Sequence, residues 1–82
     1  MRLVANIPHP KLKISILSFM DKWIIEIEGG AYKQAFKISH DAITSEEEVK
    51  KLLTEELLQG CMDRFNGMHT DFGKAFQAYK NA

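Results

Sequence analysis

The 82-residue sequence has little cysteine and proline, one and two residues, and no apolar run longer than three residues. The single cysteine, Cys61, excludes an internal disulfide, and the short apolar runs exclude a membrane-spanning helix. The chain reaches Asn6 and Pro8 before any apolar core forms, so we expect no cleaved signal peptide. These absences predict a cytoplasmic protein that does not contact a membrane.

Net charge is also absent, because 11 basic side chains balance 11 acidic ones. The two signs are unevenly distributed, with +3 in residues 1–40 and −3 in residues 41–82. A pI near 6.8 falls short of the basic character typical of nucleic-acid-binding domains. The length predicts a single domain over residues 1–82 with a small core, a size at which oligomerisation often adds stability.

Residues that could carry chemistry are present but poorly arranged for it. Ser39, His40 and Asp41 are the residue types of a catalytic triad, yet sequence neighbours rarely point at one another, and a turn is the better interpretation. Cys61 lies on an apolar stripe, where a cysteine packs as a small apolar side chain. We therefore expect no enzymatic activity, cofactor or metal. Only a cleft that gathered His40, His69 or Cys61 would indicate a catalytic or small-molecule site.

The spacing of apolar residues changes once along the chain, near Ser39-His40-Asp41. Residues 11–38 place apolar side chains at every second position, which predicts strands, and residues 45–80 place them three and four apart, which predicts helices. The expected fold is α+β: an antiparallel β-meander of three strands, or four if Arg2–Ile7 pairs as well, followed by two or three helices. The helices are expected to pack on one face of the sheet.

The meander can be aligned from its turns. Gly29-Gly30 predicts a two-residue hairpin with Glu28 opposite Ala31, and the turn near Asp21-Lys22 places Glu28 opposite Lys13. In the segment before it, Leu3, Ala5 and Ile7 are expected to share one face. The predicted core face of the meander consists of Leu12, Ile14, Ile16, Met20, Trp23, Ile25, Ile27, Tyr32, Phe36 and Ile38, with Ser18 and Gln34 as polar members.

The helical half begins at Ser45, an N-cap whose capping-box partner is Glu48. We expect one helix over about 46–66 that bends at Gly60, or two shorter helices that meet there. Asn66-Gly67 is a typical helix end. A last helix is then expected to start at Thr70 and to carry Phe72, Ala75, Phe76 and Tyr79 on one face.

The outer face of the sheet is the predicted interaction surface. It keeps an apolar patch of Leu17, Phe19, Ile24 and Ala35, with no segment left to cover it. The sequence therefore favours a small non-enzymatic protein-interaction module that binds a protein partner or itself, most simply as a homodimer. Phe19 and Leu17 are the residues on which such docking would depend.

The alternative prediction is nucleic-acid binding through lysines on the sheet, combined with Phe19 as a stacking ring. The lysines concerned are Lys11, Lys13, Lys33 and Lys37. Two of them are matched by acidic residues in the predicted register, Lys13 by Glu28 and Lys33 by Glu26. The balanced charge and these pairings make nucleic acid the less favoured partner.

Overall fold

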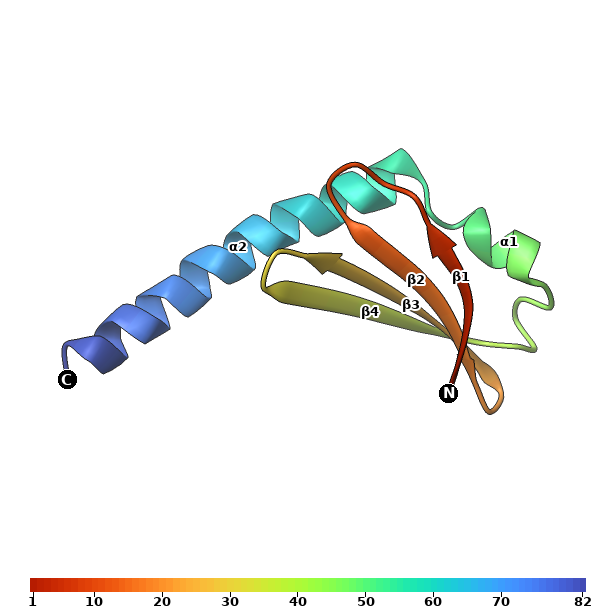
Figure 1. The fold of residues 1–82 in the computed structure, drawn as a ribbon, viewed down its shortest axis with the longest axis horizontal. Helices are drawn as coiled ribbons and strands as arrows, with labels where there is room; N and C mark the ends of the chain where they lie inside the picture. Colours follow the sequence, from red (N-terminus) through yellow and green to blue (C-terminus); the bar gives the residue numbers. More distant parts are fainter.

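A computed structural model describes all of residues 1–82 and confirms the α+β class (Figure 1). Four strands form one antiparallel sheet in the order β1-β2-β3-β4, followed by a short helix and a long one. The elements are β1 (Arg2–Ile7), β2 (Lys13–Phe19), β3 (Lys22–Gly29), β4 (Tyr32–Ser39), α1 (Glu46–Lys50) and α2 (Glu55–Lys80). The segment Arg2–Ile7 is thus a fourth strand, and the helices number two rather than three.

The register of β2 against β3 is the predicted one, with Lys13 opposite Glu28. The register of β3 against β4 is shifted by two residues from the prediction: Gly29, rather than Glu28, begins the hairpin opposite Tyr32. The turn is therefore Gly30-Ala31, with Gly30 at φ +61°, a conformation that glycine adopts without a steric penalty. A shift of two leaves every side chain on its predicted face, because faces alternate with period two.

Met20 was predicted for the core face, and this is wrong. The first hairpin pairs Phe19 with Lys22, so Met20 and Asp21 form the turn itself. Met20 adopts a φ of 57° and its side chain is exposed. A residue in a two-residue turn has left the pleat of the strand and no longer follows its alternation.

The prediction that Leu3 shares a face with Ala5 and Ile7 is also wrong. The pairing of β1 with β2 shifts between Leu3, which lies opposite Leu17, and Ala5, which lies opposite Ile16. This β-bulge adds one residue to β1 and reverses the alternation on either side of it. Leu3 is consequently exposed on the outer face, whereas Ala5 and Ile7 pack against the core.

The core lies between the inner face of the sheet and the two helices. Ile14, Ile16, Ile25 and Ile27 from the central strands are fully buried, as expected from their alternation. The helices cover them with three buried residues, Val49 from α1 and Cys61 and Phe65 from α2. At the other end of the sheet the Trp23 indole packs against this core, and its Nε1 donates a hydrogen bond to the Ile43 carbonyl at 2.8 Å.

Phe65 fixes α2 to the hairpin end of the sheet. A Cβ at Gly29 would lie 3.0 Å from the Phe65 ring and 3.3 Å from Leu12, so the absence of a side chain at Gly29 lets the ring sit directly on the strand. Only glycine fits this close approach without displacing the ring.

The helix boundaries differ from the prediction. The helix capped by Ser45 ends after five residues, and α2 begins at a new N-cap, Thr54, whose Oγ1 accepts a hydrogen bond from the Leu57 N–H at 3.1 Å. From there α2 continues without interruption past Gly60, past the expected stop at Asn66-Gly67 and past Thr70. Thr70 caps nothing; its hydroxyl donates back to the Asn66 carbonyl within the helix.

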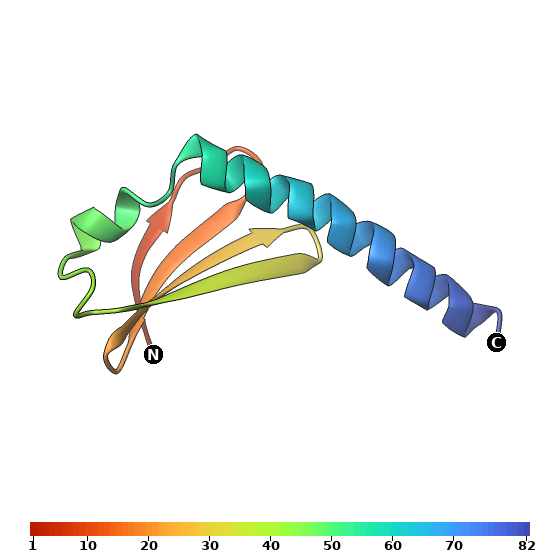
Figure 2. The same cartoon turned by 180° about the vertical axis from the view of Figure 1, so that it is seen from behind.

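The uninterrupted α2 is longer than the sheet that it covers. Its 26 residues correspond to about 39 Å, whereas an eight-residue strand spans about 27 Å and four strands lie within about 15 Å. The helix therefore runs past the β3–β4 hairpin and projects away from the sheet, which makes the molecule elongated, 50 × 26 × 18 Å (Figures 1 and 2). We call residues 69–80, all of them exposed, the arm.

Replacing Gly67 with alanine should increase the helix content of α2. Gly67 is exposed, and a Cβ there would have no atom within 4 Å, so the substitution adds helix propensity without a clash. The expected gain is about 0.5–1 kcal/mol for the turn concerned. Far-ultraviolet circular dichroism measures it, with Gly29→Ala as the opposite case, since that substitution crowds Phe65. An unchanged or lower helix signal for Gly67→Ala would contradict the uninterrupted helix.

Candidate interaction surfaces

The buried thiol and the histidine of the helical half have separate roles in the structure. Cys61 belongs to a polar bridge between β4 and α2: Gln34 Nε2 donates to the Cys61 carbonyl at 2.8 Å, and Arg64 Nη2 contacts the Cys61 sulfur at 3.3 Å. Arg64 Nε also donates to Gln34 Oε1 at 2.9 Å. His69 lies further along α2, where its Nδ1 is hydrogen bonded to the Tyr32 hydroxyl at 3.1 Å.

The triplet Ser39-His40-Asp41 forms a turn, as the sequence predicted. The Ser39 hydroxyl accepts a hydrogen bond from the Asp41 N–H, and His40 points elsewhere, with Nε2 3.3 Å from the Ser18 hydroxyl. The His40 ring also lies 4.5 Å from the Trp23 ring. The Ser18–His40 pair was not foreseen, because Ser18 is 22 residues away in sequence and only the sheet register brings the two together.

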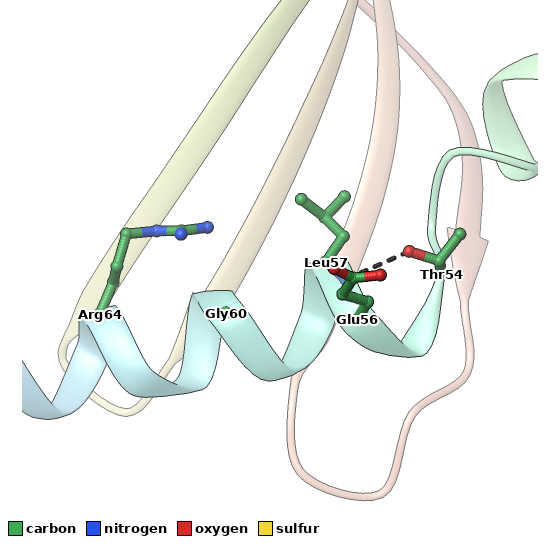
Figure 3. Close-up of a pocket in the computed structure, with 5 residues that line it drawn as sticks. All are labelled: Thr54, Glu56, Leu57, Gly60 and Arg64. Atoms are coloured by element: carbon green, nitrogen blue, oxygen red, sulfur yellow. Dashed lines mark hydrogen bonds between the residues drawn. The ribbon is translucent and has the colours of Figure 1, made fainter.

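Surface hollows are shallow, and none is lined by His40, His69 or Cys61. One lies along the first turns of α2, where the Arg64 side chain runs back toward Gly60 (Figure 3). A Cβ at Gly60 would lie 3.3 Å from the Arg64 guanidinium, so this glycine provides room for the arginine side chain, and α2 continues through it as one helix. The polar groups here are used internally, Thr54 as the helix cap and Arg64 in the bridge to Gln34.

No group of three or more His, Cys, Asp or Glu side chains is arranged to hold a metal ion. No helix of the structure combines the length and the hydropathy needed to cross a membrane.

The outer sheet face carries the predicted patch, and both helices lie on the opposite side of the sheet (Figures 1 and 2). Leu17 and Ile24 are cross-strand neighbours on this face. Because of the bulge, Leu3 lies opposite Leu17 on the same face, so an apolar row of Leu3, Leu17 and Ile24 crosses three strands. Phe19 is 44% exposed and Ala35 is exposed, whereas Ile24 is only 6% exposed. These side chains thus share the outer face, and the most exposed large apolar ones among them are Leu3 and Phe19.

The lysines of the alternative prediction are dispersed or already paired. Lys33 lies 3.7 Å from a Glu26 carboxylate oxygen and 3.6 Å from a Glu28 one. Lys13 is opposite Glu28 in the register, and Lys37 is opposite Ile24 beside the apolar patch. Lys11 lies in the β1–β2 loop, next to a hollow that Glu55 of α2 also lines. The four lysines thus form no continuous basic track.

A row of exposed aromatic side chains lies on the arm. Phe72, Phe76 and Tyr79 are 61%, 51% and 76% exposed, and their rings form a row with centroids 6.2–6.3 Å apart. The row starts at the sheet, where Tyr32 lies edge-on to Phe72 at 6.3 Å. The Lys80 ammonium lies 5.7 Å from the centroid of the Phe76 ring, and all three rings remain more than half exposed, which makes them the largest group of adjacent exposed aromatic side chains in the molecule.

This surface was only partly foreseen from sequence. The residues were predicted to share a helix face, but that face was assigned to the sheet. The signal that could have located it is an unbroken repeat with alternating spacings of three and four, formed by Leu58, Cys61, Phe65, Met68, Phe72, Ala75 and Tyr79. A repeat that long belongs to one helix, and one helix of that length must project beyond a sheet of this size.

At the base of the arm the structure has an apolar hollow of about 410 Å³, lined by Tyr32, Met68, Asp71 and Phe72. It lies where β4 begins and α2 leaves the sheet. The hollow and the row of rings adjoin each other through Phe72, so they form one continuous surface.

Comparison with protein-family models, with curated proteins and with solved structures found no match to this chain.

Proposed function

We propose that this protein is a non-enzymatic protein-interaction module and that the arm of α2 is its docking element. The observation that carries the proposal is the exposure of Phe72, Phe76 and Tyr79 on a helix that has already left its own sheet. Burial of exposed aromatic rings is a principal source of binding energy at protein interfaces, where such residues are enriched. A projecting helix with one apolar stripe suits packing against another helix or in a groove.

The outer sheet face is a second candidate docking surface. Leu3 and Phe19 are exposed there at the edges of the row that contains Leu17 and Ile24. We rank it below the arm because Ile24 is nearly covered by its neighbours and only one aromatic ring is available. Both surfaces suit a protein that acts in the cytoplasm, where the buried thiol of Cys61 stays reduced.

Affinity capture with matched variants of the arm tests this function. The tagged chain is incubated with an extract of its native cells, and Phe72→Asp is compared with Gln77→Asp, which changes the opposite side of the same helix. We expect at least one protein, including untagged copies of this chain, to be retained by the wild type and by Gln77→Asp but not by Phe72→Asp. A charge placed in an apolar interface core is rejected, whereas one on the solvated side is tolerated.

A Phe19→Asp variant separates the two surfaces. Loss of the captured protein with Phe19→Asp but not with Phe72→Asp would transfer the function to the outer sheet face. Equal retention by all four proteins would contradict docking through either surface.

A further inference from the structure

We propose that the arm binds a second copy of this chain, with the two arms antiparallel, so that Tyr79 of each copy fills the hollow between Tyr32, Met68 and Phe72 of the other. This inference rests on the proposed function and specifies its partner. It commits to one occupant and to one register, both of which follow from the residues of α2.

The register follows from the three-and-four repeat. In an antiparallel helix pair, residues of one helix at alternate core positions face those of the other in layers. Centring the pair between residues 73 and 74 places Phe72 opposite Ala75 of the second copy and Tyr79 opposite its Met68. Two-fold symmetry repeats each layer, so Phe72 and Tyr79 each meet a smaller or more flexible side chain, as interdigitated packing requires, and Phe76 lies on the flank of this stripe.

Other in-phase registers are disfavoured by the fold. A shift of one heptad toward the sheet places Tyr79 opposite Cys61, which is completely buried under its own sheet. A shift of one heptad the other way leaves only the last turns of the arms in contact. The proposed register uses the whole exposed length of the arm, and beyond it only Met68 and Tyr32, which line the hollow at its base.

The hollow at the base of the arm is the structural complement of Tyr79. Its apolar walls are Tyr32, Met68 and Phe72, and Met68 is the residue that the register places opposite Tyr79. Asp71 at its rim offers a carboxylate that can accept a hydrogen bond from the Tyr79 hydroxyl. An aromatic ring with one polar end therefore matches the chemistry of this shallow hollow.

The area available is consistent with a weak to moderate dimer. With about 200 Å² for each aromatic side chain, the exposed parts of Phe72, Phe76 and Tyr79 amount to roughly 380 Å² per copy. That is about half of the ~800 Å² per partner that a standard interface buries. Met68, Ala75 and the aliphatic stem of Lys80 lie on the same stripe or its flank and add to this area.

The weak helix propensity of this part of α2 also favours pairing with a second arm. Residues 66–73, Asn-Gly-Met-His-Thr-Asp-Phe-Gly, include two glycines and several weak helix formers. Within this segment only Met68 packs against the core, and His69 and Phe72 contact Tyr32, so the helix gains little from the rest of the chain. Packing against a second arm supplies the missing stabilisation. Charge repulsion does not oppose the pairing of two arms, because the chain has no net charge and each arm carries one acidic residue, Asp71, and two basic ones, Lys74 and Lys80.

Sedimentation equilibrium of the purified protein from about 1 to 200 µM tests the proposal, with far-ultraviolet circular dichroism over the same range. We expect a monomer–dimer equilibrium in the micromolar range and helix content that rises with concentration. Phe72→Asp should weaken dimerisation by about 30-fold or more and Tyr79→Ala by about 10-fold, whereas Gln77→Asp and Phe19→Asp should leave it unchanged.

Spin labels on cysteines introduced at Gln77 and Gln59 test the orientation. The proposed centre places the two copies of position 77 about 10 Å apart along the axis and the two copies of position 59 about 44 Å apart. A parallel pair would give equal distances at both positions. The buried Cys61 is inaccessible to the label, and a sample without the introduced cysteines provides the background.

A monomer at 200 µM would overturn self-pairing, and the function proposed above would still stand if cell extract yields an arm-dependent partner of another sequence. Dimerisation that is lost with Phe19→Asp and kept with Phe72→Asp would overturn it as well and assign the interface to the outer sheet face. Equal label distances at the two positions would overturn the antiparallel register.

Discussion

An Ile16→Asp variant is expected to be unfolded, whereas a variant of the next residue, Leu17→Asp, is expected to keep the fold. Ile16 is fully buried in β2, on the face that α1 and α2 cover. A carboxylate placed there loses its hydration and has no ion-pair partner, which costs about 5 kcal/mol or more. A domain of this length has roughly 4–12 kcal/mol of stability in total, so the substitution removes most or all of it.

Leu17 provides the matched control because it lies on the same strand and faces the opposite side. Its side chain is half-buried on the outer face, where a carboxylate can reach water, so we expect a loss of about 1 kcal/mol. Thermal and urea unfolding followed by circular dichroism measure both variants. Equal destabilisation by the two would mean that the faces of β2 are not assigned as described.

The second large effect is expected from Phe65→Ala, which should lower the free energy of unfolding by about 3–5 kcal/mol. Phe65 is 8% exposed and its ring lies against Gly29 and Leu12, so truncation leaves a cavity at the point where α2 joins the sheet. The rigid strand backbone at Gly29 cannot collapse into that space, and this places the expected cost toward the upper part of the range.

Phe72→Ala is the corresponding control, one heptad further along the same helix and 61% exposed. We expect it to change the stability of the monomer by less than about 1 kcal/mol. Urea titrations at a protein concentration low enough to exclude self-association compare the two variants. A large loss for Phe72→Ala under these conditions would show that the arm is held by its own chain and is not free to dock.

The two faces of the sheet were predictable because a side chain keeps its face when the predicted pairing is wrong by two residues. The β3–β4 hairpin slipped by two residues from its predicted register, yet Ile25, Ile27 and Phe36 stayed on the core face. The same rule explains the failure at Leu3, where a one-residue bulge reverses the face. A bulge leaves no mark in the apolar pattern of six residues, so only the pairing with β2 reveals it.

The helix boundaries were less predictable, because the local signals at Asn66-Gly67 and Thr70 are those of a helix end and a helix start. Such signals are worth about 1 kcal/mol each, which is comparable to the gain from continuing an amphipathic helix. Whether the helix stops or continues is then decided by the geometry of packing. Here Phe65 and Met68, on either side of Asn66-Gly67, both pack against the same core, and the helix continues.

The two candidate surfaces also differ in how far the sequence could locate them. Leu17, Phe19, Ile24 and Ala35 were located from the parity of the strands alone, and the structure places all four on the outer face. Their exposure was not predictable, because the coverage of Ile24 depends on the side chains around it. The arm escaped prediction because sequence showed that its rings share a face but not that the sheet ends before reaching them.

By itself, the sequence determined the class of the fold, the identity of the core face and the presence of an aromatic stripe near residues 72–79. These depend on the period of the apolar residues, which is a local property that each strand or helix carries independently. Tertiary structure decided where α2 leaves the sheet, at the contacts of His69 and Phe72 with Tyr32, and that the turns after them project beyond it. That outcome depends on the length of one element relative to another, and no local pattern encodes such a comparison.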